Sequence, residues 1–128
     1  MVLYESGENY LETILVLTER NGRVRSVDVA AELEFSKPSV SRAIGILKKE
    51  GLISVDEAGW IKLTGAGSRR AAAVLDRHNV IAGYLEEMLC VDKKTAEEDA
   101  CKIEHIISEK TFEKMKETLT NKRESTRI

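Results

Sequence analysis

Residues 26–63 limit the fold of this chain more than any other stretch, because two short helical patterns lead directly into a hairpin pattern. The first helix is predicted over residues 27–33, with Ser26 as its N-cap. The second begins after Ser36, a good N-cap, and ends at Gly51. Apolar residues at helical spacing are expected to face inward: Val29, Ala30, Leu33, Val40, Ile44 and Leu47.

A β-hairpin is predicted after the second helix. Residues 52–55 and 60–63 are mostly apolar, and the four residues between them include a glycine. A short helix, a tight break, a second helix and a hairpin form the order of a winged helix-turn-helix, whose second helix enters the DNA major groove. Winged helices also serve as protein-interaction modules, so the order of elements alone leaves both functions open.

The charge distribution favours DNA as the partner of this module. The whole chain has a formal net charge of −2, which by itself argues against a nucleic-acid-binding protein. Residues 20–70, however, hold ten Lys or Arg against six Asp or Glu. The outer face of the second helix is small at its start and basic at its end. Because a local basic patch matters more than total charge for binding phosphate, we expect contact with DNA.

The position of each residue in the motif predicts which side chains meet the duplex. One set is assigned to the groove: Ser26, Ser36, Pro38, Ser39 and Arg42. Arg42 is the candidate for a guanine contact, since a guanidinium donates two hydrogen bonds to that base. A second set is expected to bind phosphate, with a solvated face as an equal alternative for each lysine: Lys37, Lys48, Lys49 and Lys62. Trp60 is expected to brace the hairpin.

The rest of the chain is predicted to be helical, which makes the fold mainly α. The chain has one proline, Pro38, so nothing interrupts the other helical patterns. A helix is predicted over residues 8–20, and residues 121–128 are expected to fray. Three helices are predicted after the hairpin, behind N-caps at Thr64, Asp92 and Ser108, and they end near residues 89, 107 and 119.

A second constellation lies in the helical half, at Cys101, Glu104 and His105. On an α-helix, residues i, i+3 and i+4 share one face, so a thiolate, a carboxylate and an imidazole would stand side by side. Each of them is a transition-metal ligand. The alternative is structural, since cysteine is often a small buried residue and Glu–His pairs are common on helices. His78, on the apolar stripe of the preceding helix, is by itself expected to be a core histidine.

The order of these parts resembles the diphtheria toxin repressor family of metal-dependent transcription regulators, which has iron-sensing and manganese-sensing branches. The resemblance covers residues 6–119 and rests on segments in the right order and spacing, at residues 8–12, 36–41, 63–67, 77–78 and 100–105. It implies a homodimer built by the last three helices, and operator binding that requires metal. We therefore expect the short two-domain form, a winged helix-turn-helix domain over residues 1–70 and a helical metal-binding and dimerisation domain over residues 71–128.

The resemblance also assigns metal ligands residue by residue. Cys101, Glu104 and His105 match the primary site of the iron branch. His78 matches a ligand used across the family. On the first helix, Glu12 matches the manganese branch. Asn9 departs from both branches, because the iron branch has methionine there and the manganese branch has aspartate.

The expected metal site is therefore a hybrid. Ala82 and Glu97 stand where the ancillary site of the iron branch uses a carboxylate and an imidazole. A thiolate with imidazole and carboxylate suits Fe²⁺, Co²⁺, Ni²⁺ or Zn²⁺ better than Mn²⁺. We expect Fe²⁺ first and Mn²⁺ second, with Co²⁺, Ni²⁺ or Zn²⁺ as substitutes in vitro. A metal that joins Asn9 and Glu12 to the later ligands would fix the two recognition helices of a dimer.

Several classes of function are disfavoured. No apolar run is long enough to span a bilayer, and residues 1–6 lack the features of a signal peptide, so we expect a cytoplasmic protein without a membrane partner. No nucleophile–base pair, phosphate loop or pocket-forming glycine pattern predicts an enzyme. The competing hypothesis is a winged-helix regulator or interaction module that works without metal, in which Cys101 and His78 are core residues.

Overall fold

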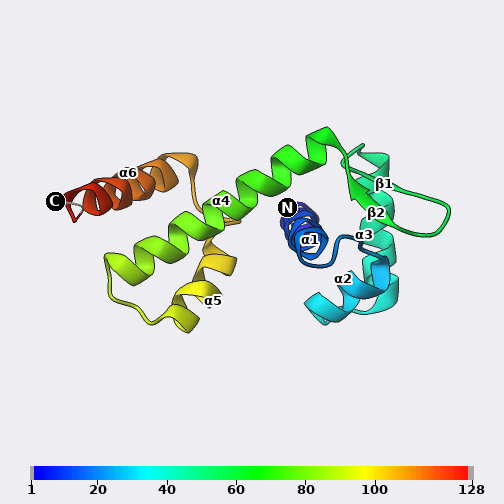
Figure 1. Cartoon of the computed structure of the whole chain (residues 1–128), viewed down its shortest axis with the longest axis horizontal. Coiled ribbons are helices and arrows are strands. Elements are labelled where there is room, and N and C mark those ends of the chain that lie inside the picture. The colour runs from blue at the N-terminus through cyan, green and yellow to red at the C-terminus, as the bar shows by residue number, and fades with distance from the viewer. Residues whose placement is uncertain (1, 127–128) are drawn as a thin grey trace. The chain divides into compact units, whose positions relative to one another are not determined.

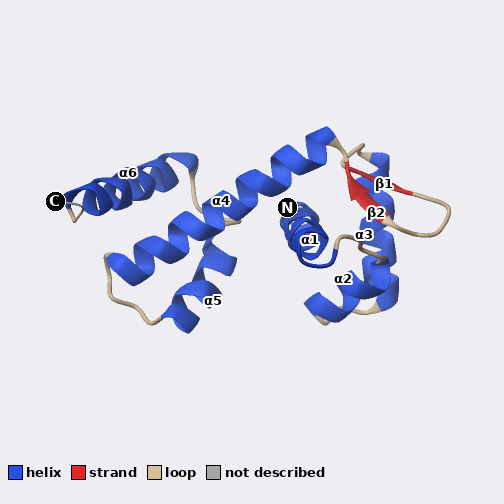
Figure 2. Cartoon of the chain, in the orientation of Figure 1, coloured by secondary structure: helices blue, strands red, loops and turns tan. Residues whose placement is uncertain are grey.

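The computed structural model of the chain describes the backbone of residues 2–126 and the side chains of residues 7–126. In that range six helices and two short strands follow one another (Figure 1). They are α1 (Val2–Asn21), α2 (Ser26–Leu33), α3 (Lys37–Lys49), β1 (Ile53–Val55), β2 (Ile61–Leu63), α4 (Gly65–Glu87), α5 (Lys93–Ile103) and α6 (Glu109–Ser125). The predicted mainly α fold is confirmed, with strands only in the hairpin among these residues (Figure 2).

The chain divides into two compact units. The first unit, Met1–Ala73, holds α1 to β2 and the start of α4, and it forms the winged helix-turn-helix. The second unit, Val74–Ile128, holds the rest of α4 together with α5 and α6. Among residues 2–126, no helix has the length and apolar character needed to cross a membrane.

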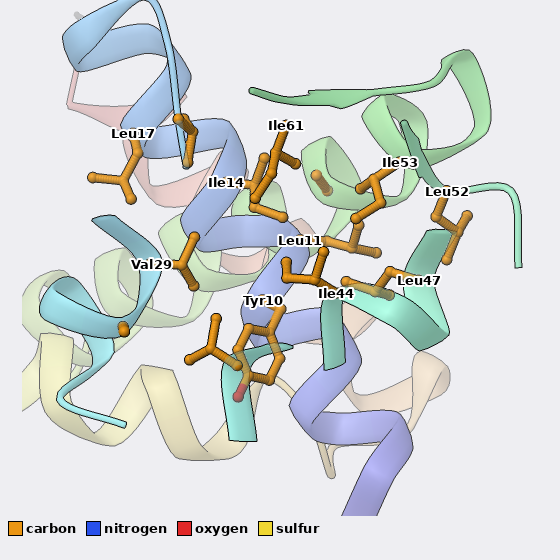
Figure 3. Close-up of a cluster of buried hydrophobic side chains, with 14 residues drawn as sticks. Tyr10, Leu11, Ile14, Leu17, Val29, Ile44, Leu47, Leu52, Ile53 and Ile61 are labelled. Carbon is orange, nitrogen blue, oxygen red and sulfur yellow. The ribbon is translucent and has the colours of Figure 1, made fainter. Parts of the chain in front are cut away.

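The core of the first unit gathers around α1. Leu11 and Ile14 are almost fully buried, as are Val40 of α3 and Val29 of α2. Figure 3 shows side chains of α1, α2, α3 and the hairpin pointing toward one another around this core. Burying one such side chain contributes roughly 1.5–3 kcal/mol. The fourteen members of this cluster are therefore the main source of stability in the described part of the unit.

α1 is longer than predicted at its N-terminal end, because it begins at Val2 and not near residue 8. No proline interrupts residues 2–7, and the helix continues through Ser6 and Gly7, a pair that often marks a turn. Its predicted end is confirmed, since Gly22 has a left-handed backbone with φ of 80° and its N–H donates to the carbonyl of Thr18.

The prediction that Ser26 caps α2 was wrong by one residue. Ser26 is the first helical residue and Arg25 is the N-cap, with its N–H donating to the Asp28 carboxylate at 2.9 Å. The preceding chain is extended because the carbonyl of Val24 accepts a hydrogen bond from the N–H of Ile61 at 2.7 Å. Val24 is held in this extended pairing, so the N-cap falls on Arg25 and the helix starts at Ser26.

The caps and ends of α3 are confirmed. The Ser36 hydroxyl accepts from the N–H of Ser39 at 3.3 Å, and Pro38 lies in the first turn, where a missing N–H costs nothing. Gly51 follows the helix with φ of 77°. The break before α3 contains Glu34, whose left-handed backbone, with φ of 56°, ends α2.

The hairpin is confirmed, with each strand one residue shorter than predicted. β1 and β2 are antiparallel, with Ser54 opposite Lys62. In the turn between them, the Asp56 carboxylate accepts from the N–H groups of Ala58 and Trp60, each at 2.9 Å. These bonds hold the turn without a tight two-residue loop.

The start of α4 is fastened to the segment that precedes β1. The Thr64 hydroxyl donates to the carbonyl of Gly51 at 2.7 Å and accepts from the N–H of Gly67 at 3.1 Å, which confirms Thr64 as a cap. At Gly67 a Cβ would lie 1.8 Å from the carbonyl oxygen of Leu52. Only glycine therefore allows this approach of helix and hairpin.

In the second unit α4 ends at Glu87, two residues before the predicted end, because Cys90 has a left-handed backbone that turns the chain toward α5. The Asp92 carboxylate caps α5 by accepting from the N–H of Thr95 at 3.0 Å, as predicted. This hydrogen bond holds the pKa of Asp92 below its usual range.

α5 ends at Ile103, four residues earlier than predicted. Residues 104–107 form a turn, because Ser108 must be extended to cap α6 through its hydroxyl. The N–H groups of Glu104 and Ile107 still donate to the carbonyls of Ala100 and Ile103, each at 3.0 Å, so some helical hydrogen bonding persists in this turn. Apolar spacing alone does not distinguish such a turn from a continuing helix.

α6 continues to Ser125, so the prediction that residues from 121 onward fray was wrong through residue 125, and residues 127–128 lie outside the described range. Near its end, Arg123 pairs with Glu87 of α4 at 2.6 Å, and the Lys122 ammonium donates to the carbonyl of Glu87. The hydrogen bond from Arg123 lowers the pKa of Glu87. These contacts between distant parts of the sequence hold the last turns of the helix.

Candidate metal centre

Three of the predicted ligands meet in the second unit. One ligand atom each from His78, Cys101 and Glu104 lies within 4.8 Å of the others. His78 comes from α4, Cys101 from the last turn of α5, and Glu104 is the residue that caps the end of α5. Imidazole, thiolate and carboxylate together form a donor set for a divalent transition metal.

Glu104 is the least solvated member of this group. Its side chain has 0% exposure, and its Oε2 lies 2.8 Å from Nδ1 of His78. Its other oxygen, Oε1, is buried and makes no hydrogen bond within residues 7–126. Nε2 of His105 is 3.3 Å from Oε1, but without hydrogen-bonding geometry, so the contact is at most electrostatic. A buried carboxylate oxygen without a donor is costly, and a bound cation would satisfy it.

His105 does not belong to this three-residue group. Sequence spacing predicted it on the same helical face as Cys101, but α5 ends at Ile103 and His105 lies in the following turn. Its ring stands beside Glu104 through the contact of Nε2 with Oε1. The turn therefore leaves His105 next to Glu104 and outside the group of His78, Cys101 and Glu104.

His78 is held between two carboxylates. Its Nδ1 faces Glu104, and its Nε2 lies 2.5 Å from Oε2 of Glu97. The side chain is 14% exposed, so it is largely buried in polar contacts and is not an apolar core residue. Glu97 was noted in the sequence only as a departure from an ancillary site. Its spacing of four residues from Cys101 and seven from Glu104, on one helical face, was the available signal.

Arg77 fixes the turn that carries Glu104. Its guanidinium donates to the carbonyl of Glu104 at 3.3 Å and pairs with Glu109 at 2.7 Å. The same group lies 5.2 Å from the centre of the Phe112 ring. The backbone of Glu104 is thus tied to α4 and to the first turn of α6.

The remaining predicted ligands, Asn9 and Glu12, lie in the first unit. Both are on α1, three residues apart, and both are half-buried. Residues at this spacing share one face of a helix. Their role as metal ligands stays a prediction.

The residues predicted to contact DNA lie on the surface of the first unit, except Ser26, which is half-buried. The hydroxyls of Ser36 and Ser39 are 2.8 Å apart, at the N-terminal end of α3. Five of these residues are exposed cations without an ion-pair partner within residues 7–126, namely Lys37, Arg42, Lys48, Lys49 and Lys62. Unpaired cations can neutralise phosphate without first breaking an internal ion pair.

Comparison with known proteins decides the family. A sequence model described as the iron dependent repressor N-terminal DNA binding domain matches residues 2–59. A second, described as the family's metal binding and dimerisation domain, matches residues 64–127. The chain belongs to the iron-dependent repressor family. The resemblance predicted from the sequence is confirmed, and with it the order of a DNA-binding domain before a metal-binding and dimerisation domain.

Individual relatives of the chain agree with this family. An uncharacterised HTH-type transcriptional regulator of Methanocaldococcus jannaschii is 34% identical over 113 residues, which are 88% of this chain and 90% of that protein. The diphtheria toxin repressor of Corynebacterium diphtheriae is 27% identical over 117 residues, 91% of this chain and 52% of that one. The chain therefore spans nine-tenths of the first relative and about half of the second.

Solved structures place the same fold in regulators of metal response. The crystal structure of T. acidophilum IdeR matches with a TM-score of 0.80 and 26% identity, over 88% of this chain and 53% of that one. The manganese regulator SloR matches with a TM-score of 0.79 and 27% identity, over 89% of this chain and 53% of that one. The chain again spans about half of these relatives.

Proposed function

We propose that the chain is a metal-activated transcriptional repressor that binds double-stranded operator DNA as a homodimer and controls metal-ion homeostasis. The observation that carries the proposal is the buried oxygen of Glu104, which makes no hydrogen bond within residues 7–126 beside a thiol and an imidazole. The two matched family domains support the other parts of the proposal, one for DNA binding and one for metal binding and dimerisation. Such a regulator belongs to a family without enzymatic chemistry.

The charges of the site explain why metal would control its conformation. A bound divalent cation supplies positive charge that offsets the thiolate and the carboxylates. Without it, Glu97 and Glu104 bring two like charges around one imidazole. To turn a mostly inactive population into a mostly active one, the metal must favour the active arrangement by about 5.5 kcal/mol.

Fe²⁺ is the proposed metal, with Mn²⁺ second. The thiolate of Cys101 and the imidazole of His78 are softer donors than those Mn²⁺ prefers. Co²⁺, Ni²⁺ and Zn²⁺ would bind the same donors in vitro. Asn9, Glu12 and His105 are proposed as further ligands.

Glu97 is proposed as the residue that orients His78. Metal-ligating histidines commonly donate their second ring N–H to a carboxylate, which fixes the tautomer. The contact of Glu97 with Nε2 leaves Nδ1, the nitrogen beside Glu104, to face a metal. Glu97 therefore acts through His78 and not as a ligand.

Operator binding with and without metal tests the proposal. DNA selected by the protein from a random-sequence duplex pool would be titrated under anaerobic Fe²⁺, with Mn²⁺, and with a chelator. We expect binding to weaken at least tenfold with the chelator, and Glu104→Gln to lose this metal response. The matched control is Glu98→Gln, which alters an exposed carboxylate on α5, the helix whose end Glu104 caps. Equal binding with metal and with chelator would instead support a metal-independent winged-helix regulator.

A further inference from the structure

The hairpin and the extended segment before α2 together present a face of cations and an indole. Val24 and Ile61 are joined by a backbone hydrogen bond of 2.7 Å and are 0% and 3% exposed. Neighbours along an extended chain point to opposite faces, so the residues beside these two point away from the core. They form what we call the wing face: Arg23, Arg25, Trp60 and Lys62. The three cations are exposed and Trp60 is half-buried.

Two guanidinium groups of the wing face gather on one ring. The Cζ of Arg25 lies 4.2 Å from the centre of the Trp60 ring, and that of Arg23 lies 5.1 Å from it. Neither arginine forms an ion pair with a carboxylate within residues 7–126. Like charges held at one indole repel each other, and an anion bound between them would remove that repulsion.

Asp56, an acidic residue of the hairpin turn, does not offset the three cations of this face. Asp56 lines the same hollow as Arg23, Trp60 and Lys62. Its Oδ1, however, accepts hydrogen bonds from the backbone N–H groups of Ala58 and Trp60, at 2.9 Å each, which stabilise the turn. On the opposite strand, the partner of Lys62 is the hydroxyl residue Ser54. The wing face keeps a net positive charge.

We propose that the wing face binds the phosphate backbone of duplex DNA, beside the bases read by α3. This inference rests on the proposed function and adds Arg23 and Arg25 to the DNA contacts. A guanidinium held on a ring presents its N–H edge in a fixed direction, and that edge matches the oxygens of phosphate. The indole stacks with guanidinium groups, so a base of single-stranded nucleic acid would have to displace them.

The salt dependence of DNA binding measures how many phosphates the wing face neutralises. The probe is a mixed-sequence duplex of about thirty base pairs, since phosphate contacts do not depend on sequence. Each lost phosphate contact should make the slope of log affinity against log salt shallower by about 0.9. We expect this change for Arg23→Gln and for Arg25→Gln, and about twice the change for the double variant.

The matched control is Arg20→Gln. Arg20 is exposed, lies on the same unit, and pairs with Glu32 at 3.2 Å. Its replacement removes the same charge, so a general charge effect would make the slope equally shallow. We expect the slope of this control to stay at the wild-type value. Urea unfolding of each variant checks that the fold is retained.

Fluorescence gives a second measurement, because Trp60 is the single tryptophan of the chain. Its emission should change when the duplex binds, and this change should shrink in Arg25→Gln. Single-stranded DNA of equal length should bind more weakly and change the emission less. A stronger response to single strands would mean that bases stack on Trp60, which would overturn the inference.

The outcomes separate this inference from the proposed function. Metal-dependent duplex binding with unchanged slopes in both arginine variants would overturn the wing-face site and leave the repressor standing. An equal slope change in Arg20→Gln would also overturn it. A wild-type protein that binds no duplex with Fe²⁺ or Mn²⁺ would overturn both.

Discussion

The two units differ in the size of their apolar cores. The first unit buries fourteen apolar residues in one cluster, whereas the cluster of the second unit has four among the residues described. Two of those four are alanines, Ala82 and Ala100, so little apolar surface is buried there. The second unit instead encloses the carboxylate of Glu104. The first unit thus has the larger buried apolar core among the residues described, and the second unit has the smaller one.

The ion pairs of the second unit do not replace a large core. Arg77 pairs with Glu109 at 2.7 Å and Lys116 with Asp76 at 3.4 Å, and most of these side chains are exposed. Exposed pairs contribute little, because solvent and salt screen them. If the proposed function holds, we expect a unit with so small a core to respond strongly to a cation at its buried carboxylate. The difference teaches that the candidate metal site and the predicted DNA-contacting residues lie in units with apolar cores of unequal size.

The largest effect is expected in the first unit, from Gly67→Ala. The new Cβ would overlap the carbonyl oxygen of Leu52, which lies 1.8 Å from its position. Forcing helix and hairpin apart should cost about 3 kcal/mol of unfolding free energy. Urea unfolding followed by Trp60 fluorescence measures it, and saturating metal should not restore it. Gly65→Ala is the control, since its Cβ meets only the flexible end of Arg69 at 3.5 Å. Equal stability of the two variants would contradict the packing described.

Metal should stabilise the second unit more than the first. At a free metal concentration one hundred times Kd, bound metal adds about 2.7 kcal/mol to the state that binds it. Hydrogen exchange should show this gain in α5 and in residues 74–87, and a smaller one in α3. If α3 gained as much protection, the two units would not differ in their dependence on metal.

A smaller effect is expected from Glu97→Gln. Removing the carboxylate that orients a ligating histidine lowers metal affinity by about 10- to 100-fold. Competition with a Co²⁺ or Zn²⁺ indicator measures the affinity, and ¹⁵N spectra of the metal-free protein should show that His78 no longer favours one tautomer. Glu98→Gln should change neither. Unchanged tautomer populations in Glu97→Gln would show that Glu97 does not orient the ring.

The smallest expected effect is a dependence of the stability of the second unit on pH. The hydrogen bond from Arg123 lowers the pKa of Glu87 below its unfolded value. The pair therefore stabilises the fold above the ordinary glutamate pKa of about 4.3, and this contribution is lost as pH falls through the lower folded pKa. Thermal unfolding between pH 6 and pH 3 should show less pH dependence in Arg123→Gln than in wild type. The same pH dependence in Lys114→Gln as in Arg123→Gln would contradict this role.

Local signals in the sequence predicted most of the fold. The caps at Ser36, Asp92 and Ser108 each depend on a hydrogen bond to a residue three positions along the chain. The hairpin likewise depends on short-range pairing with a turn of a few residues. Such interactions are visible in sequence because both partners lie within one short window.

The features that were missed depend on distant partners. α6 extends to Ser125 beside Glu87, a residue far earlier in the chain. The start of α2 is set by the pairing of Val24 with Ile61. No periodicity within one helix contains these contacts.

The site was predicted in part for the same reason. Cys101 and Glu104 are close in sequence, and the family resemblance supplied His78. The contact of Glu97 with His78 joins two helices, and the turn after Ile103 separates His105 from Cys101. A helical spacing rule predicts neighbours only while the helix continues.

The alternation of buried and outward residues in the hairpin has an evolutionary consequence. Val24 and Ile61 belong to the core, while the residues next to them belong to the surface. Natural selection can therefore exchange the outward arginines and lysine one at a time without disturbing the packing behind them. A lineage that meets a new salt concentration or a new promoter could adjust how tightly it holds DNA and keep the same folded scaffold.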